Sequence, residues 1–210
     1  MVSNHLVPIV KPLSRININS KAATFMKTNF PDAMLRPEKI DLFRFLDGGG
    51  LRKYGFEFGV EEMPTNMEGY VDFIHKLLML NTEIYYSLEK GIPRSRFTAA
   101  HEIGHVMLHN RQISDRVADY GIVQKAYRKS IPNFKNPEWQ ADEYAASILM
   151  PVNHCVNAYN EDNLNPSWFV ENFGVSYQAA KIRCENINRE MEDPRKKAQI
   201  FEILGSQDLF

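Results

Sequence analysis

The chain lacks most of the features that mark secreted, membrane-bound or nucleic-acid-binding proteins. It has two cysteines in 210 residues, Cys155 and Cys184, without C-x-x-C spacing. We expect them to be buried thiols, which suits a reducing cytosol. The 25 basic and 26 acidic side chains leave a net charge of −1, which gives no bulk electrostatic case for nucleic acid. No apolar run has the length of a signal peptide core or a membrane span, so we expect a cytoplasmic protein with no membrane partner.

The length and the ordinary composition indicate one globular unit that can bury a proper core. Residues 1–20, which include Pro8 and Pro12, are expected to form an extended or loosely ordered lead-in. Residues 21–150 are expected to form the main domain. Residues 151–210 are expected to form a helical segment that packs on that domain.

Against this ordinary background, residues 101–105 read His-Glu-Ile-Gly-His. Residues four apart on an α-helix lie roughly 6 Å apart along its axis and on one face. His101 and His105 can therefore direct imidazole nitrogens at one ion, and Glu102 can reach a water bound to that ion. This is the H-E-x-x-H pattern of zinc peptidases, with two ligands and a general base. The bland alternative for the pentapeptide alone is a solvated helix face with local pairs.

The surrounding residues favour a helix over 94–109. Ala99, Ile103 and Val106 recur at i, i+4 and i+7, which predicts a buried stripe on a face that the histidines do not share. Gly104 costs about 1 kcal/mol of helix propensity relative to alanine, so it predicts a close approach of another backbone.

A second helix is predicted over residues 137–149. Asn136 is a favourable N-cap residue, and Pro137 suits the first helical position. Ala141 begins an apolar repeat that continues to the end of this segment, and Pro151 follows it.

A catalytic zinc site usually takes three protein ligands, and Glu138 on this second helix is the best candidate for the third. Asp142 lies one turn further along, where it can accept the spare N–H of a ligand histidine. Glu143 is the alternative ligand. Taken singly, each residue has a better structural explanation: Glu138 as a first-turn acid that complements the helix dipole, and Asp142 as a surface charge.

Three segments resemble the ImmA/IrrE family of metallopeptidases. Residues 96–105, Arg-Phe-Thr-Ala-Ala-His-Glu-Ile-Gly-His, are similar to the zinc helix of that family. Residues 138–151, which end in Leu-Met-Pro, are similar to its second helix. Residues 173–176 followed by Arg183 resemble its C-terminal helical segment. The resemblance covers roughly residues 38–188.

The resemblance implies an α+β fold, with a small mixed or antiparallel sheet of about three strands packed with helices around a gluzincin-like site. It implies that Zn²⁺ binds His101, His105 and Glu138, with Glu102 as the base. It also implies that the substrates are helix-turn-helix transcriptional repressors, as in phage and mobile-element immunity systems and in stress responses. Many members have Asn where this chain has Asp142, and Phe where it has Tyr144.

Ahead of the zinc-type helix, the pattern predicts a small sheet. A helix over 37–46 should end at Asp47-Gly48-Gly49-Gly50. Strict alternation predicts a half-buried strand over 54–60, and two more strands are expected at 70–75 and 82–88, with Asn81 at or near the turn between them. The strand at 82–88 is either a core strand or the edge that holds an extended peptide.

Several residues remain as candidates for a donor to the reaction's oxyanion: His154, Tyr120, Tyr127 and Tyr144. His109 continues the spacing of the two histidines, but it lies one turn too far along to be expected as a ligand. The long connection at 110–136 either forms a wall over the cleft or is a solvated loop with a basic face.

Helices are predicted at 152–160, 166–173 and 176–188. The turn at 174–176 could belong to a helix-turn-helix, with Gln178, Lys181 and Arg183 on the recognition helix. The neutral net charge favours a helical hairpin that supports the site. Two classes of function follow: a zinc peptidase, or a non-proteolytic metal-bound regulator that binds a partner protein or DNA through these helices.

Overall fold

The chain has an α+β fold. This structure is a computed structural model, and it describes residues 6–8, 10–120, 125–127 and 132–205. Its helices lie partly in segments that the sequence predicted to be helical; the three that it did not predict are the first two and the one that begins at Thr82. The helices are α1 (Arg15–Asn29), α2 (Asp32–Leu35), α3 (Leu42–Asp47), α4 (Thr82–Glu89), α5 (Pro93–Tyr120), α6 (Pro137–Leu149), α7 (Val152–Asn160), α8 (Pro166–Phe173), α9 (Tyr177–Glu192) and α10 (Pro194–Gly205).

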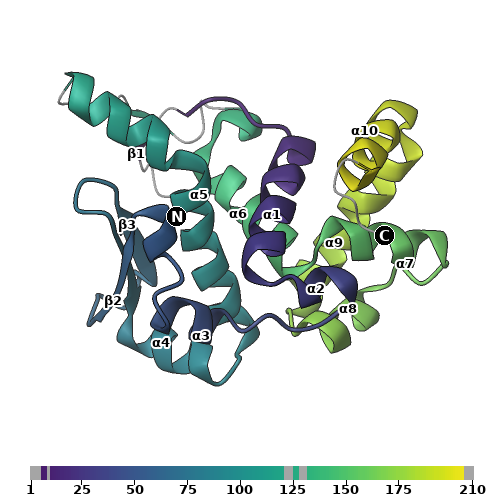
Figure 1. The fold of residues 1–210 in the computed structure, drawn as a ribbon, viewed down its shortest axis with the longest axis horizontal. Coiled ribbons are helices and arrows are strands. Elements are labelled where there is room, and N and C mark those ends of the chain that lie inside the picture. The colour runs from purple at the N-terminus through teal and green to yellow at the C-terminus, as the bar shows by residue number, and fades with distance from the viewer. Residues whose placement is uncertain (1–5, 9, 121–124, 128–131, 206–210) are drawn as a thin grey trace.

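The sheet is mixed and three-stranded, as predicted. Its order is β2 (Glu57–Glu61), β4 (Leu77–Asn81), β3 (Gly69–Asp72). The central strand β4 runs parallel to β2 and antiparallel to β3. In Figure 1 the sheet lies with α3 and α4 on one side of the molecule, α7 to α10 lie on the other, and α1, α5 and α6 lie between them.

The strand predicted at 82–88 is wrong, because these residues form helix α4. The side chain of Asn81 accepts a hydrogen bond from the Glu83 backbone N–H and so caps the helix. The real strand is the preceding apolar run, in which Leu78 and Leu80 are fully buried. A continuous apolar run of four residues is typical of a central strand, but periodicity does not separate it from a buried helix.

The other predicted elements of this half differ at their ends. Residues 52–54 form a 3-10 turn, so the strand expected from residue 54 begins at Glu57. The third strand ends at Asp72, whose carboxylate accepts hydrogen bonds from the next turn. The helix expected from residue 37 begins at Leu42, because Asp41 caps it.

The connection predicted at 110–136 is largely structured. Helix α5 continues to Tyr120, well beyond His109. A short strand β5 (Lys125–Tyr127) pairs with β1 (Leu6–Pro8), and a 3-10 turn, η3 (Asn133–Lys135), precedes α6. The lead-in expected over residues 1–20 contains the start of α1, which begins at Arg15 and packs on α6.

Downstream of Pro151, α7 and α8 have the predicted bounds, and α9 extends four residues further than predicted, to Glu192. Arg183 does not lie on an open recognition face. Its side chain is buried and donates to the Asn19 side-chain oxygen and to the Met150 carbonyl. These contacts fit the helical-hairpin interpretation of this segment.

Both cysteines, Cys155 and Cys184, are free and buried, as predicted. Among the helices that the structure describes, none is both long and apolar enough to cross a membrane.

Candidate metal centre

The two ligand-bearing helices, α5 and α6, pack closely at Gly104. A Cβ atom built there would lie 3.1 Å from the Ala141 Cα and carbonyl oxygen and 3.3 Å from the Tyr144 Cβ. The buried stripe predicted on α5 is confirmed, since Ala99, Ile103 and Val106 are at most 2% exposed. Helix α6 has the predicted bounds, with Asn136 as its N-cap. The glycine therefore lets the ligand faces of the two helices meet.

At this junction His101, His105 and Glu138 converge. Their candidate ligand atoms all lie within 4.8 Å of one another. The two Nε2 atoms are 3.0 Å apart, and the two carboxylate oxygens of Glu138 lie 3.6 Å from the Nε2 of His101 and of His105. Two imidazole nitrogens and one carboxylate form a donor set that suits zinc and other divalent transition metals.

Asp142 lies where the sequence predicted a partner for a ligand histidine. Its carboxylate accepts a hydrogen bond of 2.8 Å from the Nδ1 of His101. With a proton held on Nδ1, the Nε2 of His101 faces the other two donors. Burial lowers the pKa of His101, but the hydrogen bonds to Asp142 and Glu138 outweigh it and raise the pKa to about 10. The site thus already holds a positive charge among converging donors, and a metal ion fits there in place of that proton.

Glu102 lies beside the cluster and is only 8% exposed. Burial raises its pKa to about 7; the positive charge of His101 opposes this rise, and the nearby carboxylates of Glu138 and Glu68 add to it. Its side chain faces Gly69 of β3, where an added Cβ would lie 3.2 Å from the Glu102 Cγ. A carboxylate with a pKa near neutrality is suited to take up and release a proton.

Nothing in the sequence pattern pointed to Glu68, which lies just before β3. Its carboxylate accepts hydrogen bonds from the Thr98 hydroxyl, at 2.6 Å, and from the Arg94 guanidinium. Both partners are on the same α5 face as Glu102. Glu68 therefore links the sheet to α5 and adds negative charge beside Glu102. These contacts depend on tertiary packing and have no local sequence pattern.

The alternative ligand Glu143 is engaged elsewhere. Its two carboxylate oxygens accept hydrogen bonds of 2.7 and 2.8 Å from Arg15 of α1. His109 is fully buried and lies outside the ligand cluster, as expected, with its ring beside His105. Burial lowers the pKa of His105 to about 3 and that of His109 to about 4, so both rings are neutral.

Two of the four candidate oxyanion donors are buried in the core. The His154 ring is hydrogen-bonded to the Ala33 carbonyl and packs against Phe173. The Tyr144 side chain is fully buried and packs against the Phe25 ring. The side chains of Tyr120 and Tyr127 lie outside the described residues.

A cavity of about 840 Å³ reaches Asp142, the hydrogen-bond partner of His101, and Thr98, whereas the three clustered side chains and Glu102 do not line it. It lies between α5, α6 and α9, and most of its floor is apolar. The apolar lining consists of Phe97, Trp139, Ala146, Leu149, Val175, Ala179 and Ile182.

Strand β3 lies at the edge of the sheet, since the strand order places β4 on only one side of it. It also packs against α5. The edge strand beside the cluster is therefore β3, at 69–72, and not the segment at 82–88.

With this geometry in place, comparison with known proteins identifies the family. The sequence profile of Peptidase M78, described as the IrrE N-terminal-like domain, matches residues 53–185. The chain belongs to this family. Membership confirms the resemblance to ImmA/IrrE metallopeptidases and supports a function of the metallopeptidase type.

A solved structure of a Mycobacterium tuberculosis transcriptional regulator is similar to 80% of this chain, with 14% sequence identity and a TM-score of 0.48. The match covers 50% of that chain, so the present chain spans about half of the regulator's length. No curated protein gives a significant match.

Proposed function

We propose that the protein is a zinc-dependent endopeptidase. The observation that carries this proposal is the convergence of His101, His105 and Glu138 on one point, with Glu102 beside them. Membership of the Peptidase M78 family supports the same chemistry.

Each residue then has a definite role. A zinc ion held by the three ligands would lower the pKa of a water molecule and polarise the scissile carbonyl. Glu102 is placed to accept a proton from the attacking water and would return it to the leaving amine. Asp142 holds His101 with its proton on Nδ1, so that Nε2 is available to the metal.

The surroundings favour an extended peptide as substrate. An extended segment can add to the outer edge of β3, where no other described strand pairs, and backbone hydrogen bonds there would bring its peptide bonds past Glu102. The cavity that reaches Asp142, whose lining surface is mostly apolar, can then accept a large apolar side chain of the same segment. The substrate class we propose is the helix-turn-helix transcriptional repressors, which the resemblance to ImmA/IrrE proteins implies.

The test is incubation of the zinc-loaded protein with a helix-turn-helix repressor encoded beside it, followed by mass spectrometry of the products. We expect one defined cleavage that is absent with Glu102→Gln. Cleavage of an unrelated protein instead would keep the peptidase and reject the substrate class. Salt-dependent DNA binding without any cleavage would support the non-proteolytic regulator instead.

A further inference from the structure

We propose that His109 and Gln140 are positioning residues for the metal centre, which hold the ligand His105 with its proton on Nδ1 and its Nε2 free to bind. The inference rests on the proposed metal site. It does not depend on peptidase activity, and it can be tested without a substrate.

The side-chain amide of Gln140 is fully buried on α6, and its hydrogen bonds fix its orientation. Its Nε2 atom lies 2.9 Å from the Lys11 carbonyl oxygen and 2.8 Å from the Phe134 carbonyl oxygen. Carbonyl oxygens only accept hydrogen bonds, so the NH₂ group of Gln140 must face both of them. The amide oxygen of Gln140 is then left to face His109.

This orientation of Gln140 fixes the tautomer of His109. Its Nε2 lies 3.0 Å from the amide oxygen of Gln140, so this nitrogen must carry the hydrogen and donate it. A fully buried imidazole without a carboxylate hydrogen-bonded to it, as His109 is among the described residues, is most stable in its neutral form. A neutral ring carries one N–H, and therefore the Nδ1 of His109 is a bare acceptor.

The tautomer of His109 in turn sets the tautomer of the ligand His105. The Nδ1 of His105 lies 3.1 Å from the Nδ1 of His109. Since His109 accepts there, His105 must donate, and its proton sits on Nδ1. Its Nε2 then carries a lone pair directed at the cluster, 3.0 Å from the Nε2 of His101. The opposite tautomer would place two bare nitrogens face to face and would block the ligand atom with hydrogen.

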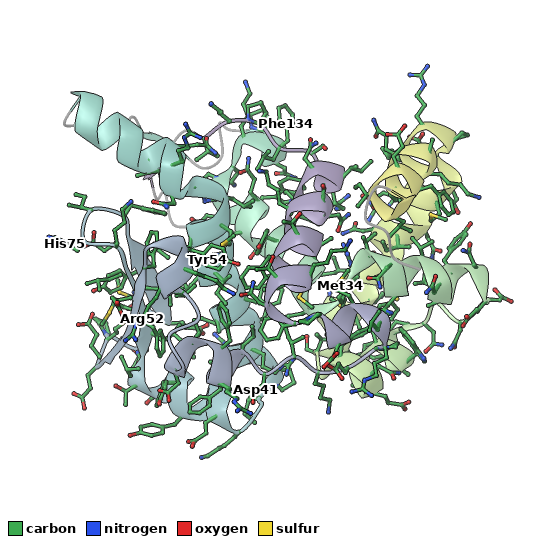
Figure 2. All side chains as sticks on the ribbon, in the orientation of Figure 1. Met34, Asp41, Arg52, Tyr54, His75 and Phe134 are labelled. Carbon is green, nitrogen blue, oxygen red and sulfur yellow. The ribbon has the colours of Figure 1, made fainter. Side chains whose placement is uncertain are left out.

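The hydrogen-bond chain ends on backbone far away in the sequence. The Lys11 carbonyl belongs to the segment before α1, and the Lys11 backbone N–H donates to the Gln112 side chain on α5. Phe134, which is labelled in Figure 2, lies just before α6, and its carbonyl also accepts from the Leu13 backbone N–H. The segment at 11–13 therefore takes part in orienting a metal ligand that is more than 90 residues away in the sequence.

The experiment compares wild type with His109→Met and His109→Gln in the full chain, by zinc titration against a chromophoric chelator. Methionine fills the space but offers His105 no strong acceptor. Glutamine can accept from His105 through its oxygen and donate to Gln140 through its nitrogen. We expect His109→Met to lose about 10–100-fold in zinc affinity, and His109→Gln to stay close to wild type.

A second measurement reads the tautomers directly. Long-range ¹H–¹⁵N spectra of the wild-type protein should show His109 protonated on Nε2 and His105 protonated on Nδ1. The proposal is overturned if His109 is found protonated on Nδ1. It is also overturned if a natively folded His109→Met binds zinc as tightly as wild type, or if His109→Gln loses as much affinity as His109→Met. Should His109→Met fail to fold, the wild-type spectra and His109→Gln still decide.

Discussion

The two sides of the metal centre are built differently. On the outer side, His101 is oriented by a charged group, Asp142, whose side chain is 49% exposed. The cavity reaches Asp142, and Glu102 lies against the edge strand β3. On the inner side, His105 meets His109, which is fully buried and neutral. A carboxylate buried on the inner side would lose its hydration, at a free-energy cost of about several kcal/mol that a buried ion pair often fails to recover. A neutral imidazole and an amide avoid most of that cost when they are hydrogen-bonded.

The two sides of the metal centre have different roles. In the proposed function, the outer side supplies the charges for hydrolysis and is the side from which we expect substrate to bind. The inner side holds the geometry of the site through hydrogen bonds to the backbone. Substitutions on the outer side should therefore change catalysis and proton release as well as zinc affinity, while those on the inner side should act through zinc affinity alone.

Glu102→Gln should have the largest effect on activity. The amide cannot take the proton of water, so cleavage should fall by about 10²–10⁴-fold. Glu102 is not a metal ligand in this account, so the variant should keep the zinc content of wild type. Cleavage assays and metal analysis on the same sample check both statements, and near-normal cleavage would show that the base has been assigned wrongly.

Asp142→Ala should weaken zinc binding by about 10–100-fold, because the Nδ1 hydrogen of His101 loses its acceptor. Asp142→Asn is the matched control, since its side-chain oxygen can still accept that hydrogen bond. It should lose much less affinity. Equal losses for the two variants would mean that the charge of Asp142, and not the hydrogen bond, matters to the site.

The two sides should also differ in proton release. The pKa of metal-free His101 is raised to about 10, so zinc must displace one proton from it at neutral pH, whereas His105, with a pKa of about 3, has none to lose. Apparent zinc affinity should therefore rise by about tenfold per pH unit between pH 6 and 8. The measurement is best made in Glu102→Gln, which removes titration of that carboxyl. An affinity independent of pH would contradict this picture of His101.

The smallest effect is expected for Gly104→Ala. The new methyl group would lie 3.1 Å from the backbone of α6, so the two helices must separate by a few tenths of an ångström. We expect a loss of zinc affinity smaller than that of Asp142→Ala, with thermal unfolding to show that the fold is kept. An unchanged or higher affinity would show that close helix packing does not set the ligand geometry.

The side chains that converge on one point could be predicted from the sequence, but the groups that hold His105 on the inner side could not. His101, Glu102 and His105 follow a local spacing, and α6 is marked by the cap at Asn136 and the proline after it. Local patterns of this kind carry their own signal because helical geometry sets which side chains share a face.

The hydrogen bonds that link His105 through His109 to Gln140 have no such sequence signal. A neutral amide has no characteristic spacing, and its partners at Lys11 and Phe134 become neighbours only when α1 and α6 pack. The misassigned strand at 82–88 has a similar cause, since Ile84, Tyr85 and Tyr86 favour strands while the cap at Asn81 starts a helix.

The most direct test of the central claim is the zinc content of purified Glu138→Ala beside wild type, by mass spectrometry of the metal. If one carboxylate on α6 and two imidazoles on α5 share a single ion, wild type should hold stoichiometric zinc and the variant should lose most of it while remaining folded. A folded variant with a full complement of zinc would contradict the shared site.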